Sequence, residues 1–343
     1  MLPEKIGNEG ELETLLSVPQ PGMVELMKRL DGDIMILGIA GKMGVTMGRQ
    51  AVEAIRAAGV DKKVYGVARF SDAAGFENLA AHGIEPIRCD LLDNSQVAQL
   101  PKVKNIIFMA GRKFGTEGAE AQTWAMNILA PFFVCDHFRN SRITVFSTGC
   151  VYPLVGPENG GCSEDVNPEP VGEYSQSCLG RERILEYGAD KFGTKLLFFR
   201  LNYAIDLRYG VLHDIAQRVW HDLPVSRSVS HFNVIWQGEA NAFALRSLEL
   251  ADNPPAILNV TGGEMIAVED IAEAFGKAFG KKVTYEGTPS GQCYLSDASK
   301  CFRLLGGTAV PLDWMIARQA EWLIEGGRSL GKPTHFEVNN GKF

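Results

Sequence analysis

The sequence predicts an α/β fold in which a doubly wound parallel sheet is followed by a smaller C-terminal α/β lobe. Two observations carry this prediction. Short apolar runs alternate with segments of helical pattern from residue 31 to residue 204, and several of these runs are apolar at every position. Strands that alternate with helices pair in parallel, and strands covered on both faces are apolar throughout. The 343-residue chain also exceeds one average domain, so a second lobe is expected.

The predicted strands of the first half are short, mostly apolar runs. They lie in residues 33–41, 63–70, 84–90, 105–111 and 143–148, with a helix predicted at 48–59. A further strand is predicted at 256–263, and helices at 268–279 and 313–326. This order gives a sheet with helices on both faces.

The domain boundaries follow from this alternation of predicted strands and helices. Residues 1–30 precede the first strand, and we interpret them as an N-terminal extension. Residues 31–204 form the main domain, to which residues 231–262 return. Residues 205–230 and 263–343 then form the smaller lobe, which we expect to bind the substrate.

The composition limits the kind of partner. A formal net charge of −7 argues against binding to nucleic acid or anionic membranes, so we expect a small molecule. The seven cysteines form no C-x-x-C pair, no run approaches the ~20 apolar residues that cross a bilayer, and the first residues are too acidic for a signal peptide. We therefore expect a cytoplasmic protein. Without H-E-x-x-H or zinc-finger spacing, we expect no metal.

A glycine pattern follows the first strand. Gly38, Gly41 and Gly44 form G-x-x-G-x-x-G between an apolar strand and a helix, the context of a Rossmann-type dinucleotide-binding turn. Glycine allows a sharp turn and brings backbone amides at the helix N-terminus close to a pyrophosphate. We assign Lys42 and Met43, inside the pattern, to the same cofactor site.

The end of the second predicted strand bears on the choice of cofactor. An acidic residue there would hold the ribose 2′-hydroxyl of NAD, but Ala68 stands at this position and Arg69 follows. A guanidinium pairs well with a 2′-phosphate, with help from Lys42, so NADP is favoured. If Arg69 is only a solvated surface charge, NAD is the cofactor instead.

Further motifs follow in a fixed order. They are CDLLD at 89–93, AG at 110–111, Asn127, STGCVY at 147–152, YSQSCLGRERIL at 174–185, RLNY at 200–203, LNVTGGE at 258–264 and LSDASKCFRLLG at 295–306. With the glycine pattern, this series resembles the extended short-chain dehydrogenase/reductases, which include the NAD-dependent epimerases and dehydratases of nucleotide sugars. The resemblance covers Ile34 to about Trp322.

The resemblance implies roles for individual residues. It makes Thr148 and Tyr174 the catalytic pair, with Thr148 bonding the substrate and Tyr174 also touching the cofactor. It places Tyr203 beside the nicotinamide, at the substrate. The remaining implied cofactor contacts are Asp90, Leu91, Ala110, Gly111, Asn127 and Asn202. A homodimer formed through the helix of the catalytic tyrosine is also implied.

One position departs from the family pattern. The family places a Lys four residues after its tyrosine, where the ammonium favours the phenolate, but Cys178 occupies that position here. Lys113, after the fourth strand, is a candidate replacement, and Arg112 is a candidate for an anionic group of the substrate. Arg112 and Lys113 fit the role of ordinary solvent-exposed surface charges equally well. Cys178 itself is not expected to act as a nucleophile.

Two histidines lie in segments that should border the substrate. We include His231 in the substrate site, because residues 230–241 differ from the family pattern, although His213 and His231 both fit a structural role better. The predicted function is NAD(P)-dependent oxidation or epimerisation of a sugar or sugar nucleotide, with Tyr174 as acid/base and Lys113 supplying charge. The alternative is a catalytically impaired sensor or scaffold that binds the dinucleotide.

Overall fold

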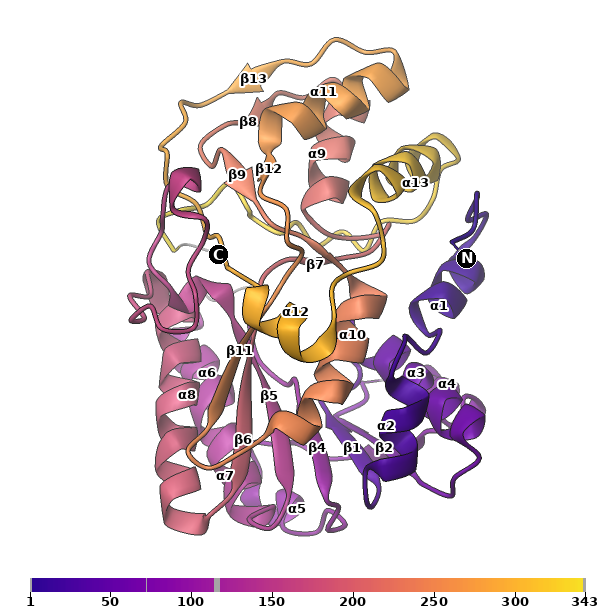
Figure 1. Cartoon of the computed structure of the whole chain (residues 1–343), viewed down its shortest axis with the longest axis vertical. Coiled ribbons are helices and arrows are strands. Elements are labelled where there is room, and N and C mark those ends of the chain that lie inside the picture. Colours follow the sequence, from indigo (N-terminus) through magenta and orange to yellow (C-terminus); the bar gives the residue numbers. More distant parts are fainter. Residues whose placement is uncertain (1, 72, 114–117, 342–343) are drawn as a thin grey trace.

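A seven-stranded parallel sheet forms the centre of the larger lobe, the lower half of Figure 1. The computed structural model describes residues 2–71, 73–113 and 118–341. The strands, in spatial order, are β11 (Ala256–Val260), β6 (Lys195–Leu201), β5 (Arg142–Thr148), β4 (Asn105–Phe108), β1 (Ile34–Leu37), β2 (Val64–Ala68) and β3 (Glu85–Arg88). The order reverses between β1 and β4, and every pair is parallel. The predicted doubly wound sheet is confirmed.

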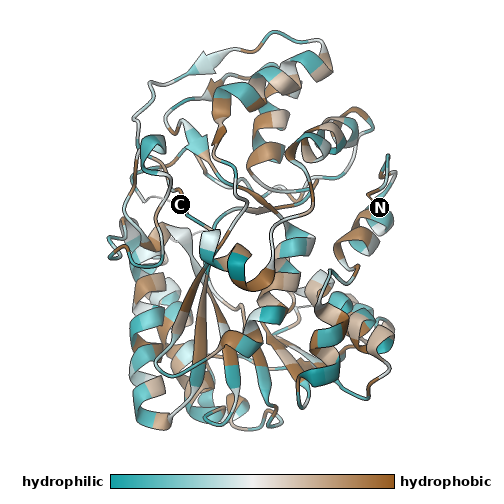
Figure 2. Ribbon diagram, viewed as in Figure 1, coloured by the Kyte–Doolittle hydropathy of each residue, from teal (hydrophilic) through white to brown (hydrophobic). Residues whose placement is uncertain are grey.

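Helices cover both faces of this sheet because its strands are apolar on both sides. In β1, Ile34 and Ile36 pack into the core under one set of helices, and Met35 and Leu37 pack into the core under the other. The first set is α2 (Met23–Arg29), α3 (Gly44–Ala58), α4 (Ala73–Ala81), α10 (Gln237–Arg246) and α12 (Ser299–Leu305); the second is α5 (Asn94–Val97), α7 (Ala130–His137) and α8 (Gly172–Phe192). Figure 2 shows the hydrophobic strands between these layers.

The smaller lobe, at the top of Figure 1, is built from three helices and three two-stranded sheets. The helices are α9 (Val211–Trp220), α11 (Val268–Phe279) and α13 (Leu312–Ile324), and they share one apolar core. The sheets pair β7 (Ala204–Ile205) with β10 (Ile235–Trp236), β8 (Val225–Ser226) with β13 (Tyr285–Glu286), and β9 (His231–Phe232) with β12 (Ile266–Ala267).

The chain returns to the main sheet after the first part of the smaller lobe. β11 pairs in parallel with β6, as the predicted strand at 256–263 requires. The strands β9 and β10 instead pair within the smaller lobe, because Phe232 and Trp236 are buried in its core. The segment that returns therefore starts with α10.

The N-terminal residues, interpreted above as an extension, form two packed helices. Leu12 and Leu16 of α1 (Glu9–Leu16) are buried in the core of the smaller lobe, whereas Met23 of α2 is buried beside the main sheet. Glu13 forms ion pairs with Arg49 of α3 at 3.1 Å and with Arg208 of the smaller lobe at 3.3 Å. This segment therefore ties the two lobes together.

Short helical turns complete the chain. They are α6 (Glu120–Trp124), the π-helix η1 (Ala125–Leu129), and the 3₁₀ turns η2 (Gly149–Val151), η3 (Pro157–Asn159) and η4 (Ser247–Leu250). No helix in the described part of the chain is both long and apolar enough to cross a membrane.

Candidate functional site

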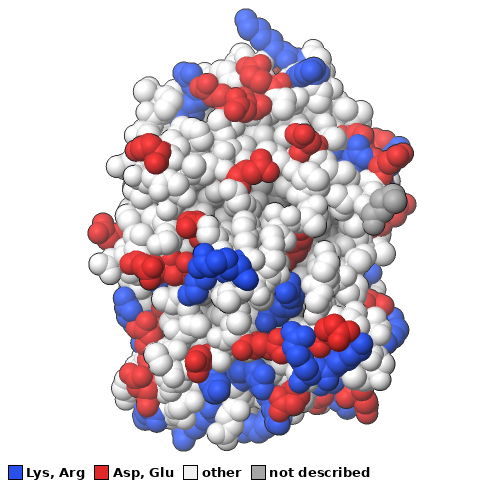
Figure 3. Space-filling view, viewed as in Figure 1, with Lys and Arg blue, Asp and Glu red and all other residues white. Residues whose placement is uncertain are grey.

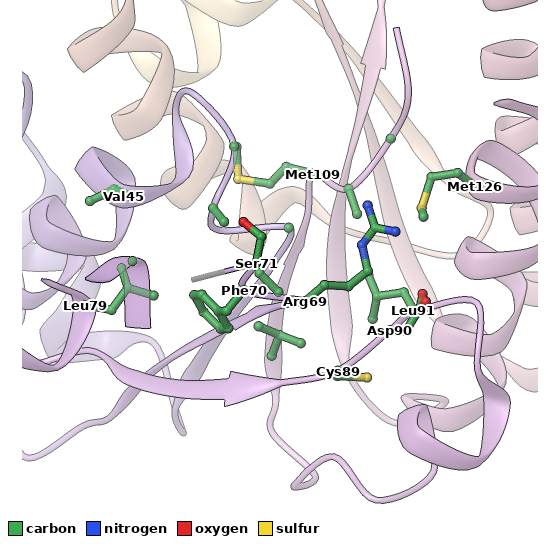
Figure 4. A pocket seen from close by; sticks show the side chains of 18 of the residues that line it. Val45, Arg69, Phe70, Ser71, Leu79, Cys89, Asp90, Leu91, Met109 and Met126 are labelled. Atoms are coloured by element: carbon green, nitrogen blue, oxygen red, sulfur yellow. The ribbon is translucent and has the colours of Figure 1, made fainter. Parts of the chain in front are cut away.

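A pocket of about 720 Å³ opens at the carboxyl ends of β1, β2, β3 and β4, where the strand order reverses (Figure 4). Open α/β sheets bind their ligands at this position. The residues predicted from the sequence to hold the cofactor that line this pocket are Gly38, Gly41, Arg69, Asp90, Leu91, Ala110 and Gly111. The glycine pattern and the motifs that follow it therefore meet at one place.

The glycine turn leaves room for a ligand because it lacks side chains. Gly38 has φ +92°, and a Cβ there would lie 2.7 Å from the Cα of Ala110. A Cβ at Gly44, where α3 begins, would overlap the carbonyl oxygen of Ile39. Gly41 lines the pocket and has only the Gly38 oxygen near its Cβ position, at 3.3 Å. These features fit a diphosphate at the N-terminus of α3.

The far end of this pocket lies beyond β2. Ala68, Arg69 and Asp90 line it, and Figure 4 shows the Arg69 side chain on the same side of the pocket as Asp90 and Leu91. Arg69 is exposed. Asp90 is held in place by its Oδ1, which accepts a hydrogen bond from the backbone N–H of Leu92 at 3.0 Å. This end is open and polar enough for an adenosine ribose.

A second pocket, of about 230 Å³, adjoins the first and shares Met109 and Gly111 with it. It lies at the carboxyl ends of β5 and β6, next to the smaller lobe. Of the residues assigned from the sequence, it is lined by Lys42, Met43, Gly111, Arg112, Lys113, Thr148, Tyr174, Asn202 and Tyr203. The predicted catalytic residues and the predicted substrate residues other than His231 are therefore brought together.

Thr148 and Tyr174 enter this pocket from different elements. Thr148 ends β5, and its Oγ1 accepts a hydrogen bond from the backbone N–H of Cys150 at 3.2 Å, so the hydroxyl both caps η2 and lines the pocket. Tyr174 lies in the first turn of α8. Burial raises the pKa of Tyr174 well above its ordinary value, and the neighbouring thiols of Cys178 and Cys150 add to this, while Arg181 opposes it.

The position four residues after Tyr174 carries no charge in this pocket. Cys178 is buried against Val151, Tyr152 and Cys162. Burial raises the pKa of the Cys178 thiol to about 11, so it is a neutral thiol at pH 7. The expectation that Cys178 is not a nucleophile agrees with this environment.

Arg181, one turn further along α8, was not assigned to the site from the sequence. Its side chain is buried, and it donates hydrogen bonds to the Phe146 carbonyl oxygen at 2.6 Å and to Asn127 Oδ1 at 2.5 Å. It lines the second pocket, and a Cβ on Gly111 would lie 2.6 Å from its Nη2. Arg181 follows Tyr174 by seven residues, so both lie on one face of α8. This spacing is the sequence feature that could have identified Arg181 as a site residue.

Asn127 supports the pocket from behind. It is fully buried in η1 and lines neither pocket. Its Oδ1 accepts hydrogen bonds from the Arg112 backbone N–H and from Arg181, and its amide donates to Ser177 Oγ at 2.8 Å. Asn127 therefore fixes the loop after β4 against α8.

Lys42 points away from the end of the first pocket that Arg69 and Asp90 line. Its Nζ donates to the Ala204 carbonyl oxygen at 3.1 Å and lies 3.3 Å from the centroid of the Tyr209 ring. Both partners line the second pocket, whereas Arg69 lines the first. The expectation that Lys42 assists Arg69 at a 2′-phosphate is therefore wrong, because the lysine side chain runs toward the smaller lobe.

The two histidines lie outside both pockets. His231 is in β9, opposite Ala267, and its Nδ1 lies 3.0 Å from Ser230 Oγ. The structure does not bring His231 together with the other predicted substrate residues, because β9 pairs with β12 in a small sheet of the upper lobe. His213 is buried and contacts Ser329 and Gln319, which fits the structural role. Among the residues that the structure describes, no three His, Cys, Asp or Glu side chains gather as metal ligands.

Solved structures with the same arrangement of strands and helices are nucleotide-sugar epimerases. UDP-glucose 4-epimerase of Thermotoga maritima, solved with UDP-glucose, superposes with a TM-score of 0.70 at 17% identity, over 86% of this chain and 99% of that one. UDP-glucuronic acid 4-epimerase of Bacillus cereus, solved with NAD, gives 0.70 at 19% identity, over 85% and 99%. The chain has the fold of these epimerases.

A third structure extends the comparison. UDP-glucose 4-epimerase of Thermus thermophilus, solved with NAD, gives a TM-score of 0.66 at 20% identity, over 84% of this chain and 98% of that one. These neighbours are members of the NAD-dependent epimerase family that the sequence resembles. No protein-family model matches the sequence, and a search of curated proteins gives no match.

Proposed function

We propose that the protein is an NAD(P)-dependent oxidoreductase or epimerase that acts on a sugar or sugar nucleotide. The observation that carries this proposal is the continuity of the two pockets. The cavity beside the glycine turn shares Met109 and Gly111 with the cavity that holds Thr148 and Tyr174. A dinucleotide seated on the glycine turn would reach the second cavity with its reactive end. Two of the neighbouring structures were solved with NAD.

The side chains of this chain supply the proton chemistry. A bound nicotinamide supplies the site that gives or accepts a hydride. Thr148 bonds the reacting substrate oxygen, and Tyr174 gives or takes the proton at the same oxygen. Because burial raises the pKa of Tyr174, the phenol is protonated at pH 7, and its activation as a base needs a nearby positive charge.

Two cations stand near Tyr174 to supply that charge. Arg181 lowers the pKa of Tyr174, and its guanidinium is fixed by Phe146 and Asn127. The Nζ of Lys113 lies 5.9 Å from the centroid of the Tyr174 ring, which keeps the predicted role of Lys113 as a further source of charge. We propose that they act together in place of a lysine at position 178.

The cofactor is proposed to be of the NAD type, with NADP as the finer assignment to be tested. NAD is the dinucleotide named with the neighbouring structures. The argument for NADP is local: Ala68 offers no carboxylate at the end of β2, and Arg69 lines the pocket there. The relative affinities for NADH and NADPH separate these two assignments.

The alternative function is a dinucleotide-binding sensor or scaffold. It is favoured by Cys178, which leaves the tyrosine in a buried pocket without a charge at that position. A sensor binds the dinucleotide but shows no turnover with any sugar. A gain of turnover in Cys178→Lys would show that the rest of the pocket supports the chemistry of the family.

The deciding experiment is a calorimetric titration with NADH and NADPH, followed by assays with UDP-glucose, UDP-glucuronic acid and simple sugars at the nicotinamide absorbance. Binding with turnover supports the enzyme. Binding without turnover across the panel supports the sensor. Failure to bind either dinucleotide contradicts both.

We also propose that the protein is a homodimer, because the family that the sequence resembles implies a dimer formed through the helix of the catalytic tyrosine. Leu129 of η1 and Tyr187 of α8 are exposed on two elements that pack against each other, and they offer apolar surface beside the tyrosine helix. Light scattering at micromolar concentration, with Tyr187→Glu as the disruptive variant, distinguishes a dimer from a monomer.

A further inference from the structure

The second pocket is lined by cations drawn from separate parts of the chain. Lys42 comes from the glycine turn, Arg112 and Lys113 follow β4, and Arg181 belongs to α8. No Asp or Glu lines this pocket among the described residues. The whole chain carries a net charge of −7, and Figure 3 shows acidic and basic side chains scattered over both lobes. The basic lining is therefore a local property of the pocket.

Three carboxylates of the described residues around this pocket already have partners. Asp206 pairs with Arg208 at 2.8 Å, and Glu182 pairs with Arg200 at 2.6 Å. Asp214 accepts hydrogen bonds from the backbone and side chain of Thr334, at 2.7 and 2.5 Å. None of these three carboxylates lines the pocket. Among the described residues, the charged side chains that line the cavity are thus all basic.

Lys42 is the cation whose environment depends most on what the pocket holds. Its amine is placed between a carbonyl oxygen and the face of Tyr209, which are weak partners for an ammonium. Burial is the main reason that the pKa of Lys42 is lowered to about 7; Lys113 and Arg208 contribute to the lowering, and Asp206 and Asp214 oppose it. An anion in the pocket would favour the ammonium form.

We propose that the second pocket binds an anionic group of the substrate, a carboxylate or a phosphate close to the reacting carbon, and that Lys42 is its main receptor. This assignment of the substrate class rests on the proposed function. The existence of the anion site rests only on the four cations and the partners of Lys42.

The cofactor diphosphate is the other anion that could reach Lys42. The geometry favours the substrate. The Lys42 amine donates a hydrogen bond to the Ala204 carbonyl oxygen and lies over the Tyr209 ring, and both of these residues line the second pocket. Gly38 and Gly41, the glycines proposed to hold the diphosphate, line the first pocket instead. The backbone of the glycine turn is the site proposed above for the diphosphate. Experiments with and without NADH separate these two sources.

The test uses inorganic sulfate, an anion that does not titrate near neutral pH, in calorimetry of the full chain at pH 7.5. We expect the wild type to bind sulfate and Lys42→Met to bind it at least about tenfold more weakly, the loss of a hydrogen bond to a charged group. Lys42→Arg should retain most of the affinity. Lys28→Met removes a surface lysine paired with Glu25 and is the matched control, with unchanged affinity.

Proton uptake gives an independent readout. Because the pKa of free Lys42 is about 7 and an anion raises it, binding at pH 7.5 takes up protons, and binding near pH 5.5 does not. Titrations in two buffers of different ionisation enthalpy measure this uptake. It should vanish in Lys42→Met, which a merely structural role for Lys42 would not predict.

The outcomes distinguish the anion site, the cofactor diphosphate and the proposed function. Equal sulfate affinity in wild type and Lys42→Met would overturn the anion site, whether or not the chain binds NADH. If saturating NADH abolishes sulfate binding and Lys42→Met weakens NADH by the same factor, Lys42 serves the cofactor diphosphate and the substrate assignment is wrong. Sulfate binding that persists with NADH bound supports it. A chain that fails to bind NADH contradicts the proposed function but leaves the sulfate comparison decisive for the site.

Discussion

The two pockets are built on opposite principles. The pocket beside the glycine turn is shaped by missing side chains, since Gly38, Gly41 and Gly111 let the backbone lie open to a ligand. The second pocket is shaped by long side chains that converge from the glycine turn, the β4 loop and α8. The first can be damaged by adding one methyl group, the second by removing one charge or one hydroxyl.

The largest expected effect comes from Tyr174→Phe, which tests the second pocket. Loss of a general acid/base should lower turnover by about 10² to 10⁴. Affinity for NADH should change little, because the first pocket is untouched. Steady-state assays and calorimetry measure the two quantities.

The matched control is Tyr187→Phe, an exposed tyrosine on the same helix α8. It should leave both turnover and affinity unchanged. Equal turnover in Tyr174→Phe and the wild type would remove Tyr174 from the mechanism.

A smaller effect is expected for Gly38→Ala, which tests the first pocket. Its φ of +92° and the 2.7 Å approach of the new Cβ to Ala110 force the turn to shift. Strain of about 1–3 kcal/mol corresponds to a loss of NADH affinity of roughly tenfold to hundredfold. Gly307→Ala, with open space around its Cβ and no positive φ, should bind NADH normally. Circular dichroism identifies a variant that fails to fold.

Arg181→Met tests whether a charge one turn from Cys178 activates the tyrosine. Arg181 lowers the pKa of Tyr174, so its loss raises that pKa further. When Tyr174 acts as a base, the rate increases as pH rises through its pKa, and the rising limb of the kcat profile should move to higher pH. We expect roughly a tenfold lower rate at pH 7, less than the full acid/base contribution.

The same profile for Lys113→Met compares the two cations. A shift in Lys113→Met and none in Arg181→Met would assign the charge to Lys113 alone. Partial recovery of the profile in Arg181→Lys would show that charge, rather than packing, is responsible.

The smallest expected effect is that of Arg69→Ala. Because Arg69 is exposed, its pairing with a 2′-phosphate is screened by solvent, and NADPH affinity should fall by at most about fivefold. NADH affinity should stay the same. Equal changes for both dinucleotides would mean that Arg69 does not read the 2′ position.

The glycine turn of the first pocket could be predicted from the sequence because its parts are local. The apolar strand, the three glycines and the helix that follows stand within twenty-five residues or so of one another, a range over which turn geometry is set by residue type. The parallel, doubly wound character of the sheet also followed, because short apolar runs alternate with helical segments, but the order of the strands in the sheet was not predicted.

The second pocket was predicted only in part. Tyr174 and Thr148 were found through a resemblance, but the direction of the Lys42 side chain depends on Ala204 and Tyr209, about 160 residues later in the chain. Asn127 lies in a π-helix, which shifts the register of one turn and has no clear sequence signature. Side-chain directions of this kind follow from tertiary packing.

The N-terminal helices limit how far the molecule can open. Glu13 is paired with one arginine on each lobe, and the indole of Trp314 donates to the Pro3 carbonyl oxygen at 2.9 Å. Any hinge motion that widens the mouth of the second pocket must strain this brace. A shortened chain that begins after α1 would therefore open more easily. It should exchange ligands faster and have a lower melting temperature, so α1 influences the rate of ligand exchange without lining the pocket.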